Sequence, residues 1–217
     1  MQMTFDDFKQ LAQSRRSIRD FSDEDVLPED VRDIIDCARF APSDTNSQTW
    51  EFIAVMNRDK IKAIEAFTWK RLDEIAAAAE TRGLAREAKL MVKSFGPYAT
   101  AFGNAPAMII CLATPYTSKF RERIFDPVQF GNPEIWAEEG IKSSCLSVQN
   151  LMLAAHAKGL ATCPMTGPVL LAEQDLREYL NIPHDRQINM AVALGHPAAK
   201  PKTIARKEID EILTFVE

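Results

Sequence analysis

The chain has 217 residues, of which 46% are hydrophobic and 26% charged, a composition that excludes a chain disordered throughout. Its net charge of −5 argues against a broad nucleic-acid-binding face, and the four cysteines and three histidines show no metal-ligand spacing. Because neither a signal peptide nor an apolar run of the ~20 residues that span a bilayer occurs, we expect a cytoplasmic protein with no metal and no membrane segment.

The N-terminal half of the chain is mainly helical in pattern. Thr4 is a suitable helix cap, and Pro28 suits the first turn of a second helix that ends before Pro42. The expected elements are a helix over residues 5–14, a helix over 28–41, a polar loop over 43–48, a strand over 50–55 and two helices within 58–95. We expect the two helices of 58–95 to form an excursion from the core.

The C-terminal half mixes apolar strand patterns with one long helix. Residues 115–134 lack periodicity and are expected to form a loop or a lid. Gly159 is expected to end the long helix. The expected elements are strands over 107–113, 160–168 in part, 188–194 and 209–216, and helices over 135–158 and 173–180. Helices and strands do not alternate regularly, and neither G-x-G-x-x-G nor a P-loop occurs, which disfavours a doubly wound nucleotide-binding fold.

Two basic segments are candidate anion sites. Arg15, Arg16 and Arg19 lie within five residues around Ser17, and arginine forms bidentate hydrogen bonds to phosphate. The alternative is a solvated basic helix end, which we consider the better explanation of these residues taken alone. Arg206 lies in a second basic stretch, for which a solvated charge run is the usual explanation.

Two loops offer polar or closely approaching backbone groups. Residues 41–50 supply hydroxyls and amides, and residues 159–168 combine glycine and proline, which let a backbone approach a ligand closely. The alternatives are a polar turn before a core tryptophan and an ordinary strand-to-helix turn. Each signal is weak by itself.

Together and in this order, these segments resemble the FMN-dependent nitroreductase family. The resemblance spans nearly the whole chain, and the N-terminal pair of segments is its most diagnostic part. It rests on residues 15–21, 38–43 with 46–48 and Trp50, 149–155, 159–160, 164–167, 194–197 and Arg206.

The resemblance implies a single domain over residues 1–217 with an α+β fold, a three-layer α-β-α sandwich around a mostly antiparallel sheet. It also implies an interlocked homodimer, in which residues 208–217 reach across to the partner and two FMN sites lie at the interface. By family position, the FMN-binding residues are Arg15, Arg16, Ser17, Arg19, Pro42, Ser43, Asn46, Ser143, Pro164, Met165, Thr166, Gly167 and Arg206. Pro42, Ser43 and Asn46 would come from the other subunit. Lys89 and Lys93 are candidates for a basic residue near the flavin pyrimidine.

The activity implied by the resemblance is transfer of electrons from NAD(P)H through FMN to small electron-poor acceptors such as nitroaromatics or quinones. No side chain is expected to act as an essential acid or base. The alternatives are a related flavoenzyme that dehalogenates reductively or fragments flavin, a non-catalytic flavin-binding protein, and an interaction domain without a cofactor.

Overall fold

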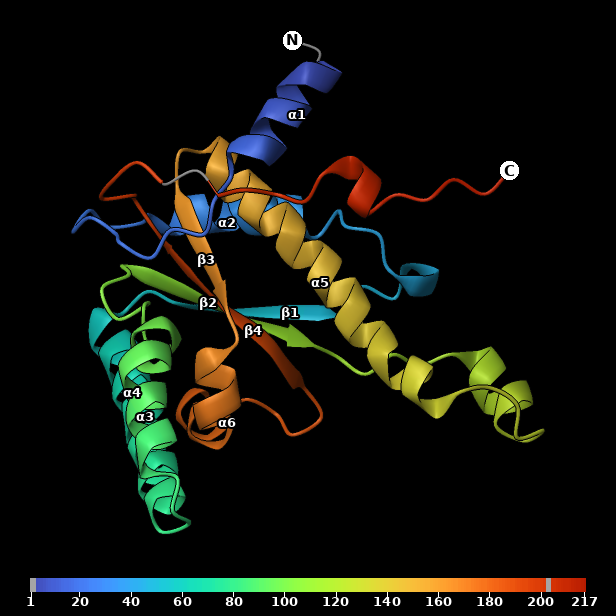
Figure 1. Ribbon diagram of the computed structural model, residues 1–217. Helices are drawn as coiled ribbons and strands as arrows, with labels where there is room; N and C mark the ends of the chain where they lie inside the picture. The colour runs from blue at the N-terminus through green and yellow to red at the C-terminus, as the bar shows by residue number, and fades with distance from the viewer. Residues whose placement is uncertain (1–2, 202–203) are drawn as a thin grey trace.

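A computed structural model describes residues 3–201 and 204–217 (Figure 1). Its centre is a four-stranded antiparallel sheet with the strand order β1-β2-β4-β3. The elements are α1 (Phe5–Ser14), α2 (Pro28–Ala38), η1 (Asp44–Asn46), β1 (Trp50–Val55), α3 (Arg58–Glu80), α4 (Ala85–Ala99), β2 (Ala107–Ala113), η2 (Arg121–Phe125), α5 (Pro133–Ala157), β3 (Ala161–Met165), α6 (Gly167–Leu180), β4 (Gln187–Gly195) and η3 (Ile209–Glu211).

The side chains of the central strands alternate between the two faces of the sheet, and helices pack against each face. Successive side chains of a strand point to opposite faces, so Met108 and Ile110 of β2 enter one core while Ile109 enters the other. The first core includes side chains of α3 and α6, and the second includes side chains of α2 and α5. The expected three-layer α-β-α sandwich with an antiparallel sheet is therefore confirmed.

Most predicted elements agree with the structure, and three differ. The strand predicted over residues 209–216 is wrong, because this tail forms the short 3-10 turn η3 and then irregular chain. Residues 115–134 contain the π-helical turn η2 rather than only a loop. Helix α6 begins at Gly167, and the helix predicted over 173–180 is the part after a kink at Ala172.

The two helices predicted within residues 58–95 are α3 and α4, which run side by side away from the sheet (Figure 1). Gly83 has a φ of +79° in the turn that joins them, a conformation that glycine adopts without steric strain. No helix in the described ranges is long and apolar enough to cross a membrane.

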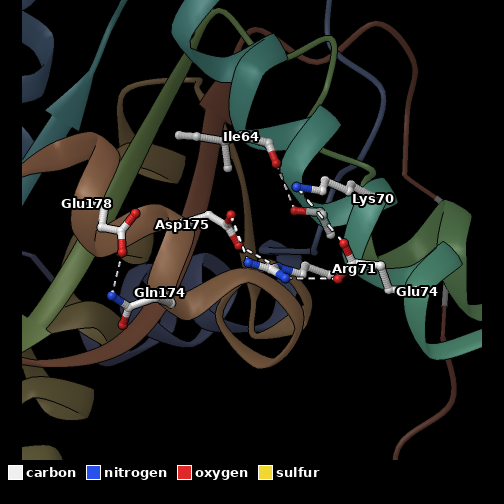
Figure 2. Close-up of polar contacts among 8 residues, drawn as sticks. Ile64, Lys70, Arg71, Glu74, Gln174, Asp175 and Glu178 are labelled. Carbon is white, nitrogen blue, oxygen red and sulfur yellow. Dashed lines mark hydrogen bonds and ion pairs between the residues drawn. The ribbon is translucent and has the colours of Figure 1, made fainter. Parts of the chain in front are cut away.

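An arginine of α3 ties this pair of helices to α6. The Nε of Arg71 donates to Asp175 Oδ2 at 2.8 Å and its Nη2 donates to Oδ1 at 3.2 Å, while Nη1 donates to Glu74 at 2.8 Å (Figure 2). The hydrogen bonds from Arg71 lower the pKa of Asp175 below its usual value of 3.8. Bidentate hydrogen bonding of this kind fixes the direction of the contact as well as its distance, so it orients α3 relative to α6.

This ion pair predicts a defined dependence of stability on pH. A carboxyl whose pKa is lowered by folding stabilises the protein above about pH 4 and loses that contribution as the pH falls through the lowered value. We therefore expect Asp175→Asn to lower the melting temperature near neutral pH, with the difference from wild type shrinking in acid. Thermal unfolding between about pH 7 and about pH 3 measures this. Asp73→Asn, at an exposed position of α3, is the control. Parallel curves for wild type and Asp175→Asn would contradict the assignment.

Candidate functional site

The N-terminal basic segment runs along the free edge of the sheet. Strand β3 is an edge strand, and Ser17 forms an isolated parallel bridge with Thr162 of β3. The N–H of Ile18 donates to the carbonyl of Thr162 at 3.0 Å, and the side chain of Ile18 packs against the core. The bridge therefore fixes the backbone that carries Arg15, Arg16 and Arg19 to the sheet.

Arg15 carries a buried nitrogen of its guanidinium group. Its Nη1 atom is buried and has no hydrogen-bond partner. Burial lowers the pKa of Arg15 below its usual value, and the neighbouring charges of Arg16 and Arg206 lower it further. Arg206, from the far end of the chain, therefore lies close to the N-terminal arginines.

No carboxylate neutralises this group within the described residues. None of Arg15, Arg16, Arg19 and Arg206 forms an ion pair, although eight pairs elsewhere in the described structure include Arg39, Arg58, Arg71, Arg121, Arg177 or Arg186. A buried donor without a partner carries the full cost of its lost hydration. The arrangement therefore fits an anion that bonds to several arginines at once.

Two hollows open beside the arginines. One has a volume of about 530 Å³ and is lined by residues 16–20 together with Lys200 and Ile204. The other has a volume of about 490 Å³, and its lining includes Gln13, Arg16 and Arg206. Both volumes fall in the usual range for small-molecule and cofactor sites, roughly 300–1,000 Å³. Arg16 lines both hollows.

His156 is a member of this site that the sequence analysis missed. It lies in the last turn of α5, and its Nε2 is 2.7 Å from the hydroxyl of Ser14. Burial, followed by the charges of Arg15 and Arg16, lowers the pKa of His156 below its usual value of 6.5. No spacing rule links Ser14 to His156, which lie 142 residues apart in the sequence.

The segment from Pro164 to Gly167 is the junction between β3 and α6. Met165 is buried in the core, whereas Thr166 is exposed and precedes the first turn of α6. Gly167 is buried, and a Cβ atom on it would lie 2.7 Å from the Cα of Ala99. The structure therefore gives Gly167 a packing role between α6 and α4, in addition to any close approach to a ligand.

A second polar cluster lies away from the arginines. The N–H of Gln48 donates to Ser43 Oγ at 2.9 Å, and the N–H of Asp44 donates to the buried Ser143 Oγ at 3.4 Å. Pro42 and Asn46 are exposed, and Asn46 has a φ of 55°. In Figure 1, η1 and residues 15–19 lie on opposite sides of α5, so one chain does not bring the two clusters together.

The expected lysines Lys89 and Lys93 are both exposed on α4. Tyr98, also on α4, contacts the basic segment, because its ring centroid lies 5.1 Å from the guanidinium carbon of Arg19. No pattern in the sequence predicted this pair.

The fold and this geometry define an α+β protein with a group of arginines beside the edge of an antiparallel sheet. The family model described as "Nitroreductase family" matches residues 12–196, and the chain therefore belongs to the nitroreductase family of oxidoreductases. A chloronitrobenzene nitroreductase of Comamonas testosteroni is 31% identical, with 95% of each chain covered.

Solved structures agree with this fold. A BluB-like flavoprotein from Clostridium difficile 630 superposes with a TM-score of 0.82 at 23% identity, with 100% of each chain covered. A nitroreductase with bound FMN from Bacteroides fragilis superposes with a TM-score of 0.67 at 19% identity, covering 96% of this chain and 98% of the other. At these identities, the likeness is one of fold.

The packing role of Gly167 leads to a stability prediction. Because the nearest atoms to an added Cβ belong to Ala99, two of them within 3 Å, Gly167→Ala forces α6 and α4 apart. We expect the free energy of unfolding to fall by about 1–3 kcal/mol, measured by urea denaturation. Leu170→Ala, at a side chain of α6 that is 75% exposed, is the control and should change stability by about 0.5 kcal/mol or less. A Gly167→Ala variant as stable as wild type would remove the packing role.

Proposed function

We propose that this chain is an FMN-dependent oxidoreductase that passes electrons from NAD(P)H to small electron-poor acceptors such as nitroaromatics or quinones. Family membership and the nitroreductase relative support the reaction class, and the FMN-bound neighbour supports the cofactor. The observation that carries the proposal is the buried Arg15 Nη1, a donor without a partner in a group of arginines that form no ion pair within the described residues.

The residues of the basic segment and of the junction between β3 and α6 fit the parts of FMN. Arg15, Arg16 and Arg206 are suited to the phosphate, because arginine bonds to phosphate oxygens with two donors at once. Ser17 and Arg19 are suited to the ribityl chain and the pyrimidine edge. The segment Pro164, Met165, Thr166 and Gly167 would line one face of the ring.

When bound, FMN would supply the redox chemistry, which is hydride uptake from the nicotinamide and electron transfer to the acceptor. The chain contributes binding and electrostatics. A guanidinium at Arg19 beside the pyrimidine edge stabilises negative charge there. No acidic or basic side chain of the site is assigned an essential proton transfer, so solvent supplies the proton.

The chain also exposes apolar side chains that favour a homodimer. Helix α1 has no buried residue, and its Phe5 is 76% exposed. In the C-terminal tail, Phe215 is 80% exposed and Val216 is 94% exposed. Large exposed apolar groups on one molecule are typical of interfaces, and twofold dimers are the commonest oligomers. In such a dimer, Pro42, Ser43 and Asn46 of one chain would complete the arginine site of the other, with the buried Ser143 supporting their loop through its bond from the N–H of Asp44.

The proposed function predicts a flavin that nicotinamide reduces. The purified protein should show flavin absorbance, or acquire it from added FMN, and the absorbance should bleach under anaerobic NADH or NADPH. Turnover of nitroaromatic and quinone acceptors is then expected. A protein that takes up no FMN would contradict the proposal. A flavin that neither nicotinamide bleaches favours a non-catalytic flavin-binding protein, and turnover of halogenated phenols alone favours a dehalogenase.

The shared site predicts complementation between two damaged chains. Arg15→Ala should weaken FMN binding at least tenfold, since a hydrogen bond to a charged group is worth about 1.5–3 kcal/mol. We expect Asn46→Ala to weaken it as well. A hybrid dimer of one Arg15→Ala chain and one Asn46→Ala chain should then keep one site of native affinity, because one site joins the two unaltered residues.

The matched control pairs a doubly substituted chain with a wild-type chain. If Arg15 and Asn46 act across the interface, this second hybrid has no intact site. Fluorescence titration with FMN of hybrids purified through two different tags separates the two arrangements. A native site in the second hybrid and none in the first would show that both residues serve the same chain's site.

A further inference from the structure

Arg19 differs from the other arginines of the site in its contact with an aromatic ring. Its guanidinium carbon lies 5.1 Å from the centroid of the Tyr98 ring, a distance at which a cation is attracted to the ring face. Among the described residues, it has no carboxylate partner that would orient it instead. The Tyr98 side chain is 61% exposed.

The end of α4 that carries Tyr98 is firmly held. Ala99 is buried against Gly167 of α6, and Gly96 lies so close to Trp69 that an added Cβ would be 2.6 Å from its ring. The hydroxyl of Thr100 donates to the carbonyl of Gly96 at 2.9 Å and closes the helix end. Tyr98 therefore presents its ring from a rigid support, whereas Arg19 extends from a loop beyond the Ser17 bridge.

The two lysines of α4 do not share this position. Lys93 precedes Tyr98 by five residues and Lys89 by nine, which in an α-helix places their side chains roughly 140° and 180° around the axis from Tyr98. The aromatic residue is thus the part of α4 that faces the basic segment.

We propose that Tyr98 is a positioning residue that holds the Arg19 guanidinium in place for the flavin. A free arginine side chain loses rotamer freedom when it binds a ligand, and a side chain held beforehand loses less. The stacking supplies that restraint without a carboxylate, so the positive charge of Arg19 stays available to the ligand. This inference rests on the proposed function, because it assigns the ligand as FMN.

The test is a double-mutant cycle on the full-length protein freed of flavin, with FMN affinity measured by fluorescence quenching. We expect Tyr98→Leu to raise the dissociation constant about two- to fivefold, and Tyr98→Phe, which keeps the ring, to leave it at the wild-type value. In an Arg19→Leu background, Tyr98→Leu should have no further effect. Tyr179→Leu removes another ring under a cation, Lys60 at 5.6 Å, and is the control with unchanged affinity.

A second measurement does not depend on flavin. In the NMR spectrum of the flavin-free protein, the Nε–Hε group of Arg19 should be ordered in wild type and in Tyr98→Phe, and mobile in Tyr98→Leu. Equal losses from Tyr98→Leu with and without Arg19 would overturn the proposal, as would an Arg19 side chain equally mobile in all three proteins. If wild type binds no FMN while the NMR pattern holds, the proposed function fails and the positioning of Arg19 by Tyr98 stands.

Discussion

The free edge of β3 is the constraint on which the site depends. The strand order β1-β2-β4-β3 leaves β3 with one unpaired side, and exposed edges are usually covered or interrupted in native proteins. Here the segment after α1 covers part of that edge through the bridge between Ser17 and Thr162. The covering segment also carries Arg15, Arg16 and Arg19. The same bridge therefore covers the sheet edge and places the basic site beside it.

The arginines gathered there repel one another, and the fold does not relieve the repulsion with carboxylates. The chain as a whole is acidic, with a net charge of −5, yet the ion pairs that its described arginines form all lie elsewhere. A buried donor such as Arg15 Nη1, with its pKa lowered by burial and like charges, lowers the stability of the flavin-free protein. Local arrangements that oppose folding are typical of functional sites, where a bound ligand compensates for them.

Local chemistry made most of the fold predictable from the sequence. The cap at Thr4 and the apolar run of β2 were read correctly, and Gly159 follows the end of α5 with a φ of +79°. The C-terminal tail has the apolar composition of a strand, but a strand needs a neighbour to pair with, and the described chain provides none. The turn η2 escaped prediction because its support is a contact between rings, Phe125 with Phe130 and Trp136, which periodicity does not detect.

The site, like the fold, has a part that the local sequence predicts and a part that only contacts between distant residues create. The arginines form a local motif, and their resemblance to a family could be read from the sequence. His156 and Tyr98 reach the site from helices far along the chain, through contacts that only the folded arrangement creates. Gly167 was read as a glycine that lets a ligand approach, but its contact with Ala99 shows that tight packing of two helices needs it as well.

The helices α3 and α4 are coupled to the site at two points. Tyr98 at the end of α4 contacts Arg19, and Ala99 next to it packs against the start of α6, where Thr166 lies. Arg71 of α3 in turn fixes α6 through Asp175 (Figure 2). A change in the α3–α4 pair therefore shifts one wall of the site relative to the basic segment. The backbone of the basic segment is anchored separately through Ser17, so Arg15 and Arg16 do not depend on this pair of helices, whereas Arg19 is coupled to it through Tyr98.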